Sequence, residues 1–309
     1  MNSRKEKPCV CVMLASYNGE KFIQEQIDSI LRQEGVIIKL VIRDDGSKDD
    51  TLQIIDKYSD NESIQIVKGQ NLGPANNFYK LLGDACEADF YAWSDQDDIW
   101  DADKLLTAVS KIAEVSSDKP ALYYSASRTV NSDKKPLSTI GTESPSLTYG
   151  AALIRSKAQG ATFVFNNALM KIARLYTPEF KKCAILHDAW LHRVCLAVDG
   201  VVVHDSTPHM SYRIHGNNVL AKAPSNKLKD RLATFFSVNT TNYCSKVANQ
   251  LLIGYGSYMP KNNYQLTYDL ANYRDQIASK MRIIFSSKYK VGVLKEDIKF
   301  KMSVLFNRA

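Results

Sequence analysis

The 309-residue sequence lacks the features that mark several classes of protein. It contains no internal repeat and no long low-complexity tract. Its longest apolar runs are broken by Lys39, Arg43 or Asp89, well short of the ~18 residues that a bilayer-spanning helix needs. A content of 45% hydrophobic and 24% charged residues is ordinary for a globular protein. We therefore expect a folded chain without a membrane span.

Cysteine and glycine are used in ways that argue against further classes. The six cysteines form no CxxC pair, so reduced thiols in a cytosolic protein are the simplest interpretation. No G-x-G-x-x-G motif follows the first apolar segment, residues 9–15, as it would in a Rossmann dehydrogenase. A nucleotidyltransferase would carry a glycine-rich basic loop where this chain has "SYNGEKF". The apolar segment itself imitates a signal peptide but favours a buried strand.

Positive charge is concentrated near the end of the chain. Residues 220–309 hold 15 Lys and Arg against 5 Asp and Glu, whereas residues 1–219 are nearly neutral at −3. A basic region is typical of contact with an anionic membrane surface or nucleic acid, and a solvated basic helix is the alternative. The contrast predicts one domain over residues 1–219 and a helical basic region over residues 220–309.

Apolar and amphipathic segments alternate through the first hundred residues. The apolar segments are 9–15, 37–43, 63–67 and 90–94, and the amphipathic ones are 20–33, 49–58 and 75–86. This alternation predicts an α/β fold with a mostly parallel sheet, whose ligand site lies at the carboxyl ends of the strands. Later we expect a strand at 121–127, a flexible polar rim at 130–146 and a helix that begins near His187.

A cluster of carboxylates, "SDQDDIW", follows the fourth predicted strand. Asp95 and Asp97 have the spacing to converge on one hard cation such as Mg²⁺ or Mn²⁺, which would keep open positions for a nucleotide diphosphate. Asp98 is interpreted as the cap of a helix that begins near Trp100, and capping alone is the alternative for the whole cluster. An aspartyl phosphatase would carry its paired aspartates after the first strand instead.

A second cluster, "DDGSKDD", follows the second predicted strand. There Asp44 and Asp45 could accept hydrogen bonds from a base N–H or a ribose hydroxyl. The alternative is a turn in which Gly46 bends the chain and Ser47 caps the next helix. Tyr17, after the first strand, could stack on a base or pack at the rim of the core.

Three later features add candidate residues. Asp188 in "LHDAW" starts a helix, where the dipole favours an N-cap but an aromatic neighbour favours a general base. His215 in "YRIHGNN" is a candidate third metal ligand or a structural histidine, and Arg213 is a candidate phosphate contact. The free amides around Asn71, ahead of Pro74, could meet an anion.

Seven stretches, in this order, resemble family 2 of the glycosyltransferases: "VMLASYNGEKFIQEQIDSIL", "LVIRDDGSKDDTLQII", "NLGPANNF", "SDQDDIW", "GATFVFNNAL", "LHDAW" and "YRIHGNN". The resemblance covers roughly residues 8–220 and implies a Rossmann-like, A-type nucleotide-diphospho-sugar transferase fold. It implies a nucleotide-binding half at about 8–115 and an acceptor-binding half at about 116–219. The last four stretches resemble the bacterial branch that contains rhamnosyltransferases of capsule, O-antigen and cell-wall polysaccharide synthesis.

The same resemblance implies roles for individual residues. Carried over by position, it implies nucleotide binding by Ala15, Tyr17, Asp45 and Asp44, metal and diphosphate binding at Asp95 and Asp97, and a catalytic base at Asp188. The base of the family usually follows an acidic residue, whereas His187 precedes it here. The resemblance also implies a single displacement with inversion at the anomeric carbon.

The expected function is therefore transfer of a sugar, namely rhamnose from dTDP-rhamnose, to a saccharide hydroxyl. Acceptors in the family are often lipid-linked. The basic region is thus expected to meet the anionic inner face of the plasma membrane rather than nucleic acid, in a cytoplasmic, peripheral enzyme. The alternatives are a UDP-hexose-dependent transferase of the same family and a catalytically inactive sugar-nucleotide-binding scaffold. Contacts within residues 125–165 are expected to select the donor.

Overall fold

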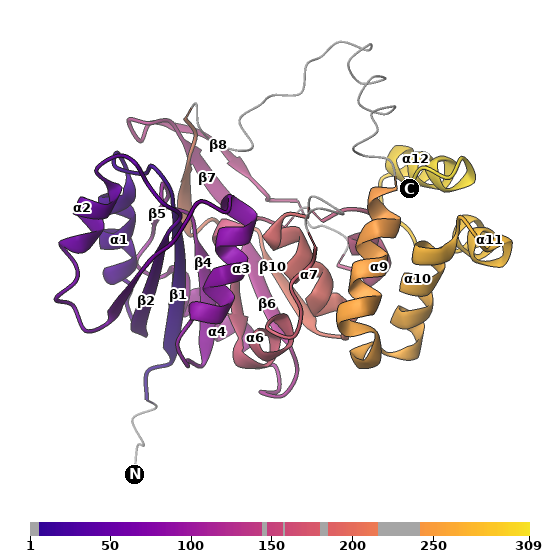
Figure 1. Ribbon diagram of the computed structural model, residues 1–309, viewed down its shortest axis with the longest axis horizontal. Helices are drawn as coiled ribbons and strands as arrows, with labels where there is room; N and C mark the ends of the chain where they lie inside the picture. The colour runs from indigo at the N-terminus through magenta and orange to yellow at the C-terminus, as the bar shows by residue number, and fades with distance from the viewer. Residues whose placement is uncertain (1–5, 144–146, 157, 180–184, 216–241) are drawn as a thin grey trace.

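The computed structural model describes residues 6–143, 147–156, 158–179, 185–215 and 242–309 (Figure 1). Strands and helices alternate through the first part of the chain in the order β1 (Cys9–Ser16), α1 (Ile23–Leu31), β2 (Ile37–Asp44), α2 (Thr51–Asp56), β3 (Ile64–Lys68), α3 (Pro74–Asp84) and β4 (Phe90–Ser94). Every one of these elements lies on a segment that the periodicity of the sequence predicts. The predicted alternation is therefore confirmed.

The next elements complete this sheet and add a second one. They are β5 (Ile99–Trp100), α4 (Lys104–Ile112), β6 (Ala121–Ser125), β7 (Ser127–Val130), β8 (Pro136–Ile140), α5 (Tyr149–Ile154), η1 (Gly160–Thr162), β9 (Val164–Asn166), α6 (Asn167–Ala173), α7 (His187–Ala197), β10 (Val201–Asp205) and β11 (Met210–Arg213). The larger sheet has seven strands in the order β10-β6-β9-β4-β1-β2-β3, and only β9 runs antiparallel to its neighbours. A mostly parallel sheet is thus confirmed. The smaller sheet has the order β5-β11-β7-β8.

Both faces of the larger sheet are covered by helices (Figure 1). In β1, Val10, Val12 and Leu14 belong to a core that includes α1 and α4, whereas Cys11 and Met13 belong to a core that includes α3, α6 and α7. A strand buried on both faces needs apolar side chains at consecutive positions. This is why the first segment is a continuous apolar run rather than an alternating one.

Two local expectations are wrong. Part of the segment expected to be a polar rim forms β8 (Pro136–Ile140), which pairs with β7. The sequence does not predict this strand because its side chains are mostly exposed and its apolar residues do not alternate with polar ones. The helix expected near Trp100 begins only at Lys104. Trp100 instead lies in β5 and pairs with Met210 of β11, because that pairing satisfies backbone groups a helix would have used internally.

Helices end the chain, as expected for its basic region. They are α9 (Tyr243–Tyr255), η3 (Gly256–Tyr258), α10 (Lys261–Asn272), α11 (Ile277–Phe285) and α12 (Leu294–Leu305), while residues 220–241 of the expected region lie outside the described residues. Buried side chains of these helices, such as Leu251 and Leu270, join the core on the α7 face of the sheet. Within the described residues, no helix has the length and apolar character required to cross a bilayer.

Candidate functional site

The carboxyl ends of β1, β2 and β4 meet at one edge of the larger sheet, because β1 lies between the other two strands. Ser16, the last residue of β1, donates from its hydroxyl to Oδ1 of Asp44 at the end of β2, at 3.0 Å. Ala15 lies half-buried beside it and pairs in register with Arg43. The polar clusters that the sequence places after these strands therefore share one edge.

Tyr17 is held against the loop that follows β4. The side-chain amide of Gln96 accepts from the backbone N–H of Tyr17 at 2.8 Å and donates to its carbonyl oxygen at 2.9 Å. The side chain of Tyr17 stays 41% exposed, so its ring is available to a ligand. Gly19 packs so closely that a Cβ there would overlap the Gln96 amide. The contact fixes the position of Tyr17 relative to the Asp95–Asp97 segment.

The carboxylate of Asp44 is fully used within the protein. Its Oδ1 accepts from the hydroxyls of Ser16 and Ser47, and its Oδ2 accepts from the backbone N–H groups of Gly46 and Ser47 at 3.0 and 2.8 Å. The side chain is buried. This geometry favours the turn interpretation of Asp44. Ser47 serves this turn and does not cap α2, whose N-cap is Asp50.

Asp45 organises the loop that leads into α3. Its carboxylate accepts from the Arg43 guanidinium at 2.9 Å and from the backbone N–H groups of Leu72 and Gly73, each at 2.9 Å through Oδ2. It is buried, whereas Asn71 in the same loop is exposed. Asp45 therefore shapes the loop and leaves Asn71 accessible.

Asp97 and His215 form a contact between residues far apart in the sequence. Nε2 of His215 lies 2.6 Å from Oδ2 of Asp97, and both side chains are largely buried. The His215 ring also packs on Phe22, with ring centroids 5.0 Å apart. The half-buried Asp95 lies close to other carboxylates: burial, followed by the charges of Asp97 and Asp188, raises the pKa of Asp95 to about 7. Excess negative charge at this edge favours a cation.

Arg213 is buried and directs its guanidinium into the protein. It donates to the carbonyl oxygens of Asp97 at 2.9 Å and Ser132 at 3.0 Å, and to the Glu25 carboxylate at 2.6 Å. Glu25 also pairs with Lys134; burial alone would raise the pKa of Glu25, but these two cationic partners lower it. These contacts hold the Asp97 backbone, and a phosphate contact by Arg213 stays a prediction.

Asp98 is buried beneath the site and does not cap a helix. It accepts from the backbone N–H of Arg213 at 3.3 Å. Burial, with the charges of Asp97 and Asp95, raises its pKa well above the ordinary value. Lys104 lies 3.6 Å above the centre of the Trp100 ring, and burial lowers its pKa to about 7. Asp98, the third carboxylate of "SDQDDIW", is thus a buried residue that supports the loop of Asp95 and Asp97.

Asp188 lies in the first turn of α7, and its charge contributes to the raised pKa of Asp95. Its Oδ2 accepts from the backbone N–H of Gly160 at 3.3 Å, and the N-cap of α7 is Leu186 rather than Asp188. His187 stacks on Phe78 with ring centroids 3.9 Å apart. Burial lowers the pKa of His187 to about 4, so the imidazole beside Asp188 is neutral at pH 7.

The residues at this edge fit a cation that is only partly coordinated by protein. No group of three or more His, Cys, Asp or Glu side chains within the described residues is arranged to hold a metal ion. Mg²⁺ and Mn²⁺ in nucleotide sites are commonly held by one or two carboxylates together with substrate phosphates. The Asp97–His215 contact, beside the carboxylate of Asp95, supplies donors of the right kind for such a shared site.

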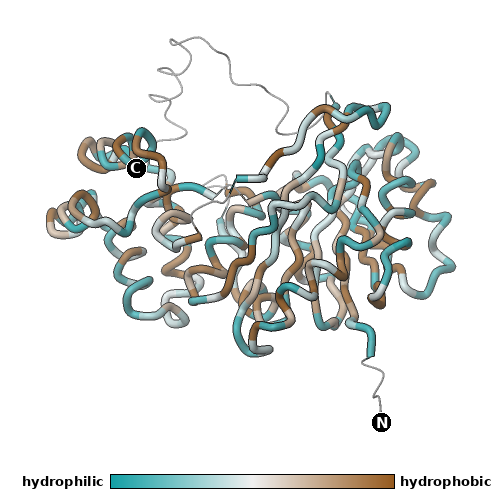
Figure 2. The backbone as a smooth tube through the Cα atoms, turned by 180° about the vertical axis from the view of Figure 1, so that it is seen from behind, coloured by the Kyte–Doolittle hydropathy of each residue, from teal (hydrophilic) through white to brown (hydrophobic). Residues whose placement is uncertain are grey.

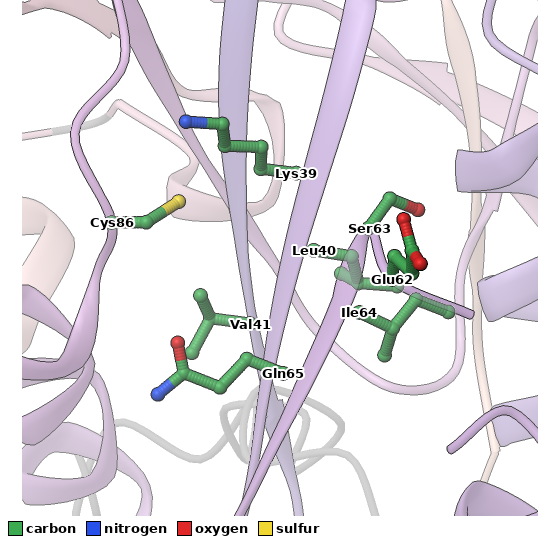
Figure 3. A pocket seen from close by; sticks show the side chains of 8 residues that line it. All are labelled: Lys39, Leu40, Val41, Glu62, Ser63, Ile64, Gln65 and Cys86. Atoms are coloured by element: carbon green, nitrogen blue, oxygen red, sulfur yellow. The ribbon is translucent and has the colours of Figure 1, made fainter. Parts of the chain in front are cut away.

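A separate pocket of ≈ 250 Å³ lies on β2 and the start of β3 (Figure 3). It is lined by Lys39, Leu40, Val41, Glu62, Ser63, Ile64, Gln65 and Cys86. Cys86 lies 3.3 Å from Cys11, sulfur to sulfur, and the cysteines of the described residues are free thiols. None of the residues predicted to bind a nucleotide sugar lines this pocket, so it is distinct from the carboxyl edge.

The sequence motifs do not predict three residues of the site. Gln96 lies between the two predicted metal ligands. Its side-chain amide can both donate and accept a hydrogen bond, and this is the signal that could have marked it as a contact to a neighbouring loop. Gly160 opens the stretch "GATFVF", where a glycine is compatible with the close approach of Asp188. Glu25 carries no such signal, because its position on α1 resembles any exposed helical glutamate.

Comparison with known proteins identifies the class. The fold is similar to the crystal structure of Staphylococcus aureus TarS 1–349 in complex with UDP-GlcNAc, with a TM-score of 0.56, 16% identity and coverage of 96% of this chain and 90% of that chain. The protein therefore has the A-type fold of nucleotide-sugar transferases. The Glycosyl transferase family 2 profile matches residues 11–164. The dTDP-rhamnosyl transferase RfbG of Shigella flexneri is 31% identical over 252 residues, which are 77% of this chain and 84% of RfbG.

The chain belongs to glycosyltransferase family 2, as its motifs indicate. A second relative is the poly(ribitol-phosphate) beta-N-acetylglucosaminyltransferase TarS of Staphylococcus aureus strain Mu50, 29% identical over 180 residues. That match spans 56% of this chain but only 30% of TarS. The matched segment is thus a transferase core that the two proteins share, and the proteins differ outside it.

Proposed function

We propose that the protein is an inverting glycosyltransferase that moves rhamnose from dTDP-rhamnose to a saccharide hydroxyl in bacterial cell-surface polysaccharide synthesis. The observation that carries the reaction is that the start of α7 packs against the end of β4. The ring of His187, next to Asp188, lies with its centroid 4.8 Å from that of Trp93, two residues before Asp95. The choice of donor is supported by the similarity to RfbG over most of both chains.

Asp188 is proposed as the general base. It lies at the start of α7, where its Oδ2 accepts from the Gly160 N–H at 3.3 Å and its Oδ1 accepts from the Ala189 N–H at 2.6 Å. Each carboxylate oxygen keeps a second lone pair that can accept a proton from an acceptor hydroxyl. The hydroxyl oxygen then attacks the anomeric carbon as the bond to the diphosphate oxygen breaks on the opposite face. One displacement inverts the configuration, and no covalent enzyme intermediate is required.

Asp95 and Asp97 are proposed to hold Mg²⁺ or Mn²⁺ together with the donor diphosphate. His215 is proposed to join them as a third ligand only when the cation binds, because its Nε2 now contacts Oδ2 of Asp97 at 2.6 Å. When bound, the cation would neutralise charge that develops on the leaving diphosphate. Asp97 is already oriented for this by its contact with His215 and by the Arg213 bond to its carbonyl oxygen.

The nucleotide is proposed to lie along the carboxyl ends of β1 and β2. Tyr17 presents an exposed ring, Ala15 lines the end of β1 and Asn71 is accessible in the loop before α3. Asp44 and Asp45 are proposed to shape these loops, because their carboxylates already accept hydrogen bonds from the protein.

The acceptor is proposed to be a lipid-linked saccharide, reached at the inner face of the plasma membrane. This proposal is supported by the excess of Lys and Arg in residues 220–309 and leaves the enzyme cytoplasmic and peripheral.

A donor panel tests the proposal. The full chain is incubated with dTDP-rhamnose, UDP-glucose and UDP-GlcNAc, each with Mn²⁺, Mg²⁺ or EDTA, and both nucleotide release and thermal stabilisation are measured. We expect dTDP-rhamnose to stabilise the protein most and to be turned over only with metal. If a UDP-hexose is preferred, the donor is that UDP-hexose and not dTDP-rhamnose. If donors stabilise the protein but none is turned over with any acceptor, the result favours the inactive scaffold.

Two substitutions separate the proposed roles. Asp188→Asn is expected to lower kcat by at least ~100-fold while donor-dependent stabilisation persists. Asp97→Ala is expected to abolish the metal dependence of donor binding. Asp60→Asn, an exposed site elsewhere, is the matched control. Activity of Asp97→Ala equal to that of the unchanged protein would refute the proposed metal site.

A further inference from the structure

Helix α11 is apolar on the side that faces solvent. Ile277 and Phe285 are 80% and 76% exposed, and Met281 between them is also exposed. Their spacing of four residues places them on one face of the helix. The opposite face is already buried through Ser279 and Ile283. Burial inside this protein therefore does not account for the outward apolar residues.

Helix α12 repeats this arrangement. Leu294 is 76% exposed, and Ile298, Met302 and Leu305 follow at intervals of four, four and three residues, all of them exposed. On its inner side, Phe300 stacks on Tyr289 with ring centroids 6.0 Å apart. A surface helix of a globular protein is normally apolar on one side only. A helix that is apolar on both sides is expected to bury its second side against another apolar surface.

The two outward faces belong to neighbouring helices. α11 packs against α12 at the end of the molecule drawn in yellow in Figure 1, and Figure 2 shows hydrophobic segments along both helices. The terminal apolar surface consists of Ile277, Met281, Phe285, Leu294, Ile298, Met302, Leu305 and Phe306. Large exposed apolar side chains gathered on two neighbouring helices mark an interaction site.

The charge around this surface indicates which partner covers it. Residues 277–309 contain eight Lys and Arg and two Asp and Glu, a surplus of +6. Lys288, Lys290 and Lys295 are exposed in and beside the loop that joins the two helices. A second copy of the chain would bring an equal positive charge to the interface, whereas an anionic bilayer attracts it.

We infer that α11 and α12 form a membrane-binding device whose terminal apolar surface enters the interfacial region of an anionic phospholipid bilayer, with the lysines at the headgroups. Apolar side chains on one side of a helix and basic residues near it are the features of interfacial helices. The inference deepens the proposed membrane attachment and rests on it, but it does not depend on the sugar that is transferred.

Flotation of the full chain with vesicles of phosphatidylglycerol and phosphatidylcholine, or of phosphatidylcholine alone, tests the inference. We expect at least tenfold stronger binding to the anionic vesicles at low salt. The double variant Phe285→Ser and Leu294→Ser should lose tenfold or more of this binding at low and at high salt. The triple variant Lys288→Glu, Lys290→Glu and Lys295→Glu should lose binding mainly at low salt.

Leu137→Ser, at an exposed leucine of β8, is the matched control and should bind as the unchanged protein does. All substituted positions are exposed, and unaltered thermal unfolding confirms that each variant is folded. Full binding by the double serine variant would overturn the inference. The inference would also be overturned if the unchanged protein does not bind vesicles but forms a dimer that the double serine variant dissociates. Turnover of a water-soluble acceptor by the double variant separates loss of membrane binding from loss of catalysis.

Discussion

Gln96 holds Tyr17 by both of its backbone groups, accepting from the N–H at 2.8 Å and donating to the carbonyl oxygen at 2.9 Å. The two residues belong to the loops that follow β1 and β4. One side chain between the two proposed metal-binding aspartates thus also positions the ring proposed to stack on the nucleotide. The base and diphosphate ends of the donor would be aligned through this contact.

Replacing Gln96 with alanine should weaken donor binding more than catalysis. Each lost hydrogen bond costs ~1 kcal/mol, so the KM for the donor should rise by about 10-fold or more, with a smaller change in kcat. Steady-state kinetics measures both. Gln53→Ala, an exposed amide on α2, serves as the control. An equal fall in kcat with unchanged KM would show that Gln96 acts on the reaction rather than on donor position.

Gly160 should tolerate no side chain, because a Cβ there would lie 2.8 Å from Cβ of Asp188 and 3.1 Å from Nε2 of His187. Displacing the proposed base is expected to lower kcat for Gly160→Ala by about 10- to 100-fold. Gly83→Ala is the control, since an added Cβ at Gly83 of α3 meets nothing within 4 Å. Similar kinetics for the two variants would contradict the position assigned to Asp188.

Arg213→Lys should destabilise the fold although the charge is kept. Lysine cannot reproduce the planar fork that reaches the Asp97 and Ser132 carbonyls and Glu25, and we expect a loss of ~2 kcal/mol in urea unfolding. Arg155→Lys, in the exposed pair with Glu296, should change stability by less than ~0.5 kcal/mol. Normal stability with weakened donor binding would instead support the prediction that Arg213 contacts a phosphate.

Asp205 should make stability depend on acid pH. Burial would raise its pKa, but hydrogen bonds from the Thr207 N–H, Lys111 and Tyr123 lower it from 3.8 to about 2. Because the folded-state pKa is the lower one, the stabilisation is present above about pH 4 and is lost as the pH falls through about 2.

The variant Asp205→Asn should therefore melt several degrees lower than the unchanged protein at pH 6, and the gap should narrow between pH 4 and pH 2. Melting followed by circular dichroism across this range provides the measurement. Asp199→Asn, at a side chain that is 71% exposed, is the control. A gap that stays constant with pH would mean that packing, and not charge, gives Asp205 its effect.

Much of the sheet could be predicted from local patterns. Doubly buried strands such as β1 need continuous apolar runs, and α1 and α3 need apolar residues at helical spacing, so these elements are visible in any short window. β8 is not visible in this way, because an exposed strand is held by its backbone ladder with β7 and not by apolar burial.

The sequence by itself determined which predicted strand each acidic cluster follows. It also determined the candidates Asp95, Asp97 and Asp188 and the excess of positive charge near its end. Only the tertiary structure decided that Asp44 serves a turn, that Gln96 holds Tyr17, and that α11 and α12 are apolar toward solvent. The physical reason is separation along the chain: Arg213 reaches Glu25 across 188 residues, and no local pattern contains a hydrogen bond of that range.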